Sequence, residues 1–171
     1  RSLPRSRAAD PAPPLMQINS ACYRMRKIGP DINGSPIMSD VREIMAQHPA
    51  TLGPEDTLEA AWNLMRSLHI RHVPVLKDDR VVGLVTQKDL MASLTNVNFL
   101  TLPVAEIMVS NVQSVAPDTT LSEAATILYD RKISCLPVVD PAQNVLIGMV
   151  TESDYLALAV RMLKREEAIG A

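Results

Sequence analysis

The chain has 171 residues, of which 47% are hydrophobic and 21% are charged, and its formal net charge is −2. This length and composition allow one domain with a hydrophobic core, plus a tail. The near-neutral charge and the 3% content of aromatic residues disfavour nucleic-acid binding, which needs a positive surface for phosphates and aromatic rings for base stacking.

The sequence also disfavours a membrane or secreted protein. No apolar run approaches the roughly 20 residues of a membrane span, and no signal peptide is predicted. Cys22 lies in a predicted tail and Cys135 in a predicted core strand, so a disulfide between them is not expected. A reducing, cytoplasmic location is therefore predicted.

Residues 1–37 are predicted to form an N-terminal tail or linker, because prolines recur along them and interrupt regular structure. This composition is typical of an extended or disordered lead-in. In the alternative interpretation, the apolar parts of the tail pack onto the rest of the chain or onto a partner subunit. These parts are Leu15, Met16, Ile18 and the segment Tyr23 to Ile28.

The remainder of the chain contains the same unit twice, in residues 38–100 and 101–171. The first copy opens with VREIM at 41–45 and contains GLVTQKD at 83–89; the second has VAEIM at 104–108 and GMVTESD at 148–154. Roughly a third of the aligned positions are identical at a spacing of about 63 to 65 residues, which indicates an internal repeat. A unit of about 50 to 60 residues would be marginal alone, so we expect the two to share a core.

Each copy predicts a short extended piece, a helix, two strands and a final helix. Apolar residues follow helical spacing from Leu58 and from Leu121. The expected capping boxes of these helices are Asp56 with Glu59 and Thr120 with Glu123. The expected strands are 73–76, 81–85, 136–139 and 145–150, and the final helices are expected to start near Asp89 and Asp154.

The order of these motifs resembles a tandem pair of CBS domains (the cystathionine-β-synthase type), often called a Bateman module. The resemblance covers residues 41–161 and depends on four motifs that each occur twice: EIM, P-x-x-T-L, I-x-x-h-P-V-h and G-h-V-T-x-x-D, where h is apolar. It implies an α+β fold in which two βαββα repeats pack with pseudo-two-fold symmetry. It also implies two clefts between the repeats, and association of the pair into a homodimer.

The resemblance further implies a function. Members of this family commonly bind AMP, ADP, ATP or S-adenosylmethionine and regulate an attached or partner protein, so a non-catalytic, energy-sensing module with an unknown regulated partner is expected. Two alternatives stay open: a structural dimerisation module with empty clefts, and a small enzyme acting on a nucleotide. The enzyme is disfavoured because the sequence has no GxSxG, Walker-type or HExxH motif and no evident acid–base pair.

The residues themselves favour a nucleotide site after the second strand of each copy. Asp89 and Asp154 are expected in the first turn of a helix, where a carboxylate can accept hydrogen bonds from a ribose diol while the helix amides favour a phosphate. Thr86 and Thr151, three residues earlier, are expected to contact the phosphate or the ribose. The alternative is that these residues only cap their helices.

By resemblance, an adenine pocket lies just before each Pro-Val strand. Thr151 and Asp154 would then face the first copy, and Thr86 and Asp89 the second. Core packing is the alternative for the two isoleucines and the cysteine among the pocket residues. The expected pocket residues are Ile70, Arg71, His72, Ile133, Ser134 and Cys135, with Met45 and Ala50 or Met108 and Gln113 as the opposite wall.

The two clefts are expected to differ in charge. Lys88 beside Asp89 favours a polyphosphate, whereas Glu152 and Ser153 beside Asp154 favour a less anionic or metal-bridged ligand. No metal site is predicted from the histidines, because His69 and His72 are expected on different elements and His48 is isolated.

Overall fold

The computed structural model describes residues 40–95 and 98–169. Most of the chain's predicted elements fall in these ranges. The predicted tail, residues 1–37, lies outside the described residues, and so do Cys22 and the apolar parts of that tail.

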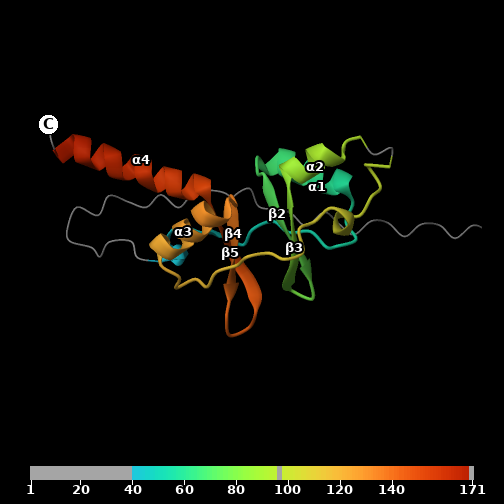
Figure 1. Ribbon diagram of the computed structural model, residues 1–171, viewed down its shortest axis with the longest axis horizontal. Coiled ribbons are helices and arrows are strands. Elements are labelled where there is room, and N and C mark those ends of the chain that lie inside the picture. The colour runs from blue at the N-terminus through green and yellow to red at the C-terminus, as the bar shows by residue number, and fades with distance from the viewer. Residues whose placement is uncertain (1–39, 96–97, 170–171) are drawn as a thin grey trace, which may run out of the picture.

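Two similar sets of elements follow each other along the chain (Figure 1). Each set is a helix, a β-hairpin and a second helix, as predicted, and the sheets are antiparallel, which confirms the α+β fold. The first set is α1 (Leu58–Leu68), β2 (His72–Lys77), β3 (Arg80–Thr86) and α2 (Gln87–Ser93). The second is α3 (Leu121–Arg131), β4 (Cys135–Asp140), β5 (Val145–Thr151) and α4 (Glu152–Ile169). Short elements precede each set: the 3-10 turn η2 (Val41–Glu43) and β1 (Ala46–Gln47) before the first, and η3 (Val104–Glu106) before the second.

Threonine side chains define the starts of the first helices in both sets. The predicted capping box of Thr120 with Glu123 is confirmed at α3. The box of Asp56 with Glu59 is wrong: the Thr57 hydroxyl accepts a hydrogen bond from the Ala60 amide at 3.2 Å and caps α1. The Asp56 carboxylate instead accepts from the Gly53 amide at 2.7 Å, because it precedes the cap and faces the turn before the helix.

The opening segment of each repeat packs on the other repeat. The β1 strand pairs with β5, with Ala46 opposite Met149. In the equivalent place, the amide and carbonyl groups of Val109 and Leu84 form two hydrogen bonds, of 2.9 and 3.0 Å. The unit that repeats along the sequence is therefore not the unit that packs, because residues 40–47 and 104–109 are exchanged between the two halves.

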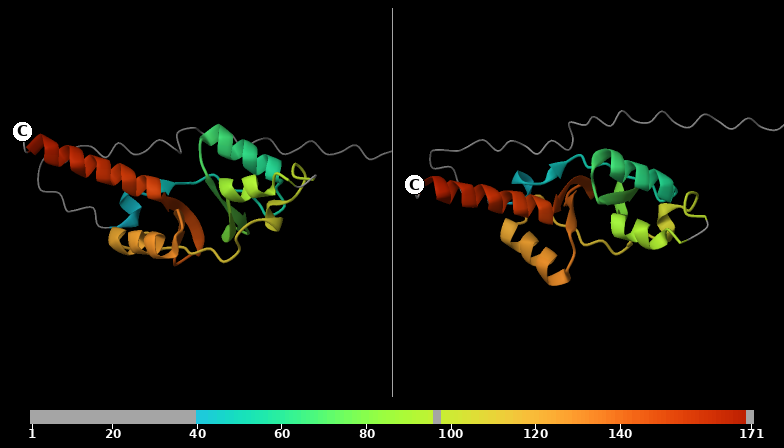
Figure 2. Two further views of the ribbon diagram at one scale, coloured as in Figure 1. Left: turned by 45° about the horizontal axis from the view of Figure 1, so that its top comes forward. Right: turned by 90° about the horizontal axis from the view of Figure 1, so that it is seen from above.

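Two hydrophobic clusters result, one in each half, and each contains a residue donated by the other repeat. Val104 is fully buried in the first and Val41 in the second, and burying one such side chain stabilises the fold by about 1.5–3 kcal/mol. The two hairpins lie side by side in the middle of the molecule, with α1 and α2 beyond one hairpin and α3 and α4 beyond the other (Figures 1 and 2). The first cluster is Leu52, Leu58, Ala61, Met65, Ile70, Val73, Val75, Val85, Leu90, Phe99 and Val104; the second is Val41, Val115, Ala124, Leu128, Leu136, Val138 and Val150.

The exchange depends on a close contact between a methionine and a glycine in each half. A Cβ atom on Gly83 would overlap the side chain of Met108, and one on Gly148 would lie 2.6 Å from Sδ of Met45. The Gly148 position is the tighter of the two in one respect, because its Cβ would also lie 3.0 Å from the carbonyl oxygen of Ala46. The methionine of the EIM motif and the glycine of the G-h-V-T motif are thus two sides of one contact.

Gly148→Ala should lower the free energy of unfolding by about 1–3 kcal/mol, because the backbone of β1 cannot move as a side-chain end can. Gly83→Ala should cost less, since it meets only the flexible side chain of Met108. Gly53→Ala is the control, as its Cβ would meet nothing closer than 3.6 Å. Urea unfolding measures all three, and equal losses at Gly148 and Gly53 would contradict the proposed role of the contact.

Candidate functional site

The first Thr–Asp pair closes a capping box at the start of α2. The amide and hydroxyl of Thr86 donate to Oδ2 of Asp89 at 3.0 and 2.7 Å, and the Asp89 amide donates to the Thr86 hydroxyl at 3.2 Å. The capping interpretation is therefore confirmed for this pair. Contact of the same residues with a ligand stays a prediction.

The second pair repeats two of these three hydrogen bonds at the start of α4. The amide and hydroxyl of Thr151 donate to Oδ2 of Asp154 at 2.7 and 2.8 Å. Burial raises the pKa of Asp154, while the hydrogen bonds from Thr151 act in the opposite direction. In both pairs the threonine bonds use Oδ2 alone, so the other carboxylate oxygen is not involved in them.

The hairpin register brings the pocket residues close to these pairs. His72 lies opposite Thr86 in the first hairpin, and Cys135 lies opposite Thr151 in the second. The Gln87 amide donates to the Arg71 carbonyl at 2.8 Å, and the Glu152 amide donates to the Ser134 carbonyl at 3.1 Å. Each pocket segment therefore contacts the helix start of its own repeat; the crossed arrangement implied by the resemblance stays a prediction.

One hydrogen bond joins the two predicted pocket segments directly. Nε2 of His72 and Oγ of Ser134 lie 2.7 Å apart, although the residues are 62 positions apart in sequence. Burial lowers the pKa of His72, and the nearby Arg71 guanidinium lowers it further, while the Asp89 carboxylate acts in the opposite direction. A neutral imidazole is thus favoured at the boundary between the repeats.

The other predicted site residues divide into buried and exposed groups. Ile70 and Cys135 are 7% and 3% exposed, and burial raises the pKa of the Cys135 thiol to about 12, so the thiol stays protonated at neutral pH. Ile133 packs at the edge of the second cluster, as core packing predicted. Exposed positions are occupied by Arg71, Lys88, Glu152 and Ser153.

The methionines of the predicted opposite wall are only partly buried. Met45 packs against the second cluster and Met108 against the first, each beside the glycine described above. Ala50 likewise packs against the first cluster. The side-chain amide of Gln113 donates to the Ser114 carbonyl. The contacts seen for these four residues are thus contacts within the protein.

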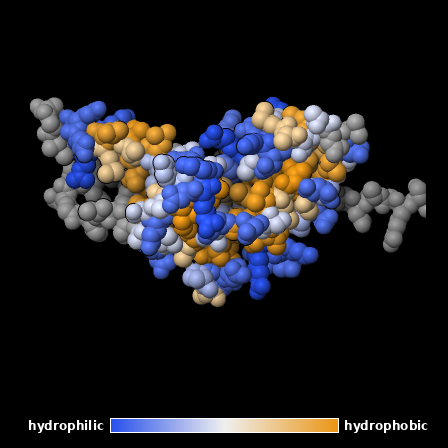
Figure 3. Space-filling model, viewed as in Figure 1, coloured by the Kyte–Doolittle hydropathy of each residue, from blue (hydrophilic) through white to orange (hydrophobic). Residues whose placement is uncertain are grey.

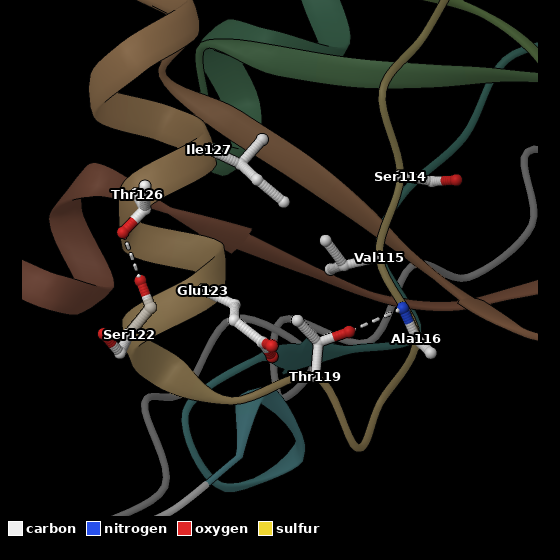
Figure 4. A pocket seen from close by; sticks show the side chains of 8 residues that line it. All are labelled: Ser114, Val115, Ala116, Thr119, Ser122, Glu123, Thr126 and Ile127. Atoms are coloured by element: carbon white, nitrogen blue, oxygen red, sulfur yellow. Dashed lines mark hydrogen bonds between the residues drawn. The ribbon is translucent and has the colours of Figure 1, made fainter.

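Two cavities in the described part of the chain are lined by residues other than the predicted site residues. One of 570 Å³ lies between α3 and the segment before it, and the motif analysis did not single it out. Two of its hydroxyls have partners within the protein: Thr119 accepts from the Ala116 amide, and Thr126 donates to the Ser122 carbonyl (Figure 4). The lining residues are Ser114, Val115, Ala116, Thr119, Ser122, Glu123, Thr126 and Ile127. A second cavity, of 430 Å³, is lined by Ala92, Ser93, Thr95, Leu102, Glu106 and Ile107.

Two further searches of the described residues concern metals and membranes. Within residues 40–95 and 98–169, no group of three or more His, Cys, Asp or Glu side chains is placed to hold a metal ion. None of the helices in those ranges has the length and apolar character that crossing a membrane requires.

His72 should make the fold sensitive to mild acid. Because its pKa is lowered in the folded protein, the unfolded chain takes up the proton first as pH falls below 6.5, and the free energy of unfolding should fall there. His72→Gln should flatten this dependence in urea unfolding between pH 7.5 and about 5. His69→Asn, which suits the left-handed end of α1, is the control and should keep it. An unchanged slope in His72→Gln would refute the assignment.

Comparison with known proteins shows the family to which the chain belongs. A model of the CBS domain matches residues 41–96 and 104–161. The CBS domain-containing protein YhcV of Bacillus subtilis is 31% identical over 135 residues, which cover 78% of this chain and 93% of YhcV. The chain also matches IMP dehydrogenases and homoserine O-acetyltransferases, but it spans only 21% to 27% of their lengths.

Solved structures agree with the family match. A Vibrio cholerae structure assigned to acetoin utilization (AcuB) is 38% identical, with a TM-score of 0.68 over 77% of this chain and 98% of that one. The CBS domain pair of protein MJ0100, solved with 5′-methylthioadenosine and S-adenosyl-L-methionine, is 26% identical, with a TM-score of 0.67 over 74% and 99%. The resemblance of the motifs is confirmed, and the chain belongs to the CBS domain family as a tandem pair of these domains.

Proposed function

We propose that this CBS pair is a regulatory module that binds an adenosine compound between its two repeats and does not catalyse a reaction. The observation that carries the proposal is the pair of equivalent Thr–Asp arrangements at the ends of β3 and β5. The MJ0100 pair, which has adenosine compounds bound, supports the choice of ligand class.

The chemistry of each Thr–Asp pair suits a ribose. Oδ2 of Asp89 and of Asp154 is held by two donors from the preceding threonine, which fixes the carboxylate in place before a ligand arrives. The remaining oxygen, Oδ1, can accept a hydrogen bond from a ribose hydroxyl, and a carboxylate acceptor makes that bond a strong one. The positive end of the helix dipole beside it favours a phosphate, although the Gln87 and Glu152 amides there already donate within the protein.

The contact between the repeats gives the proposal its regulatory step. The hydrogen bond of His72 with Ser134 joins two segments that we propose to line the adenine pockets. A ligand that contacts both segments would favour one relative placement of the repeats over others, and it shifts that equilibrium only through such a difference in affinity. A partner protein, or a domain attached to the pair, would respond to the placement.

The two clefts are proposed to prefer different ligands. Lys88 is exposed next to Asp89, and an ammonium group there favours ADP or ATP over AMP. Glu152 is exposed near Asp154 and disfavours a polyphosphate, so that cleft suits a less anionic compound such as S-adenosylmethionine.

A structural role in dimerisation is the second candidate function, and one observation favours it. Met91 on α2 and Leu94, which caps the end of α2, are 55% and 51% exposed, and Leu100, which follows, is 57% exposed. Apolar side chains gathered on a surface mark contacts with other proteins. We propose that this surface joins two copies of the chain, whether or not the clefts are occupied.

Removing the carboxylate charges tests ligand binding. Asp89→Asn and Asp154→Asn keep an acceptor for the threonine amide but lose a charge-assisted hydrogen bond, so each should weaken binding at its cleft by about 10- to 100-fold. Titration calorimetry with AMP, ADP, ATP, S-adenosylmethionine and 5′-methylthioadenosine measures the effect. Glu123→Gln is the matched control, because it alters an equivalent capping box at α3 that is not in a proposed cleft.

With a ligand at 100 times its dissociation constant, the free energy of unfolding of the wild-type protein should rise by about 2.7 kcal/mol. No heat and no thermal shift with any of the five compounds at millimolar concentration would overturn the sensing proposal in favour of the structural one. Turnover of ATP would establish the enzyme instead.

Lys88→Ala should weaken ATP binding by roughly two- to fivefold and AMP binding less, because only the longer phosphate chain extends to the ammonium group. The same calorimetric titrations measure both affinities at low salt. Lys77→Ala, at the far end of the β2–β3 hairpin, is the control. Equal changes for AMP and ATP would remove the argument that the clefts differ in charge.

Met91→Lys with Leu94→Lys should convert a dimer into a monomer, because two charges would be buried in an apolar contact. Light scattering coupled to size-exclusion chromatography measures the molecular mass. Leu156→Lys, at a 66% exposed apolar position on α4, is the control and should leave the dimer intact. Loss of the dimer only in the Leu156 variant would place the dimer contact on α4 and contradict the proposed contact at Met91 and Leu94.

A further inference from the structure

The last helix presents an apolar surface that nothing in the described part of the chain covers. Leu156, Val160 and Leu163 are 66%, 42% and 59% exposed, and their spacing of four and three residues places them on one side of α4. We call these three residues the α4 outer face. The helix extends away from the strands (Figures 1 and 2), and hydrophobic residues gather on it in the space-filling view (Figure 3).

The borders of the α4 outer face are acidic. At 100° per residue, exposed Glu152 and Glu167 continue the same line at its two ends, and exposed Glu166 lies beside it, whereas Lys164 is the one basic neighbour on that side. The exposed Arg165 lies on the opposite side of the helix. A segment that covered this face would therefore combine apolar side chains with positive charge.

Such a segment exists in the part of the chain that precedes the repeats. Residues 15–28 contain no Asp or Glu, and Arg24, Arg26 and Lys27 alternate with apolar residues there. We propose that residues 15–28 dock on the α4 outer face of the same chain. The apolar residues of the segment are Leu15, Met16, Ile18, Tyr23, Met25 and Ile28.

The geometry allows the segment to dock on its own chain. Asp40, where the described structure begins, pairs with Thr120 at the start of α3, and the neighbouring Leu121 carbonyl accepts a hydrogen bond of 2.8 Å from the Tyr155 hydroxyl of α4. The connecting residues 29–39 span up to about 36 Å when extended. The 18 residues of α4 are about 27 Å long, so every turn of the helix is within reach.

The composition of the connection fits this role. Residues 29–39 include Gly29, Pro30, Gly34 and Pro36, and this composition suits a connection that turns back toward α4. Docking would remove apolar side chains of both partners from water, and the opposite charges would fix the direction of the segment along the helix.

A spin label on Cys22 tests the proposal in the full chain. The cysteine lies within the docking segment, and Cys135, at 3% exposure, is protected from the reagent. Isotope-labelled protein carrying the nitroxide is diluted into an excess of unlabelled, unmodified protein. The methyl signals of Leu156, Val160 and Leu163 should then broaden strongly, while those of Met91 on α2 and of Leu94 at its end should not.

A triple variant serves as the matched control. Arg24→Glu, Arg26→Glu and Lys27→Glu together should reduce the broadening several-fold without altering the repeats. Unbroadened α4 signals in the wild type would overturn the proposal, as would equal broadening of α2 and α4. A second experiment mixes isotope-labelled chains that lack the nitroxide with chains that carry the nitroxide but no isotope. Broadening seen only in this mixture would identify a second copy as the occupant and would also overturn the proposal.

Discussion

The contact between a methionine of one repeat and a glycine of the other is the constraint on which the rest of this structure depends. It occurs twice, as Met45 with Gly148 and Met108 with Gly83, and it allows each opening segment to cross to the opposite hairpin. A larger residue than glycine would press on the Ala46 carbonyl at Gly148 and on the Met108 side chain at Gly83. Because each hydrophobic cluster includes a valine from the other repeat, neither half has a complete core by itself. The two halves should therefore unfold as one cooperative unit.

This interlocked arrangement also positions the candidate site. The hairpins end in Thr86 and Thr151, and their register places His72 and Cys135 opposite these threonines. Once the exchange fixes the two hairpins relative to each other, the segments before them meet, as the bond between His72 and Ser134 shows. The chemistry proposed for the clefts thus depends on a contact formed by glycine backbone and methionine side chains.

Much of the fold could be predicted from the sequence because the signals were local. The helices, hairpins and Thr–Asp caps follow from apolar spacing and from residues with strong positional preferences, and the strands differ from those predicted by one residue at their ends. The exchange of residues 40–47 and 104–109 could not be predicted that way, because the two copies have the same pattern and the pattern does not say which copy a segment packs on. The cap of α1 was assigned one residue too early for a similar reason, since both Asp56 and Thr57 are good cap residues. The bond of His72 with Ser134 joins positions that are not equivalent in the repeat, so the duplication gave no signal for it.

The use of a single oxygen in each Thr–Asp pair has a consequence for the empty state. If the carboxylate oxygen that accepts the capping bonds also bound the ligand, the threonine amide would lose its acceptor whenever the ligand bound. Here Oδ2 accepts the threonine amide and hydroxyl at the start of α2 and of α4, so a proposed ligand held through the other oxygen would leave these bonds in place. Under the proposed function, exchange at unchanged backbone order would let the pair follow a changing ligand concentration.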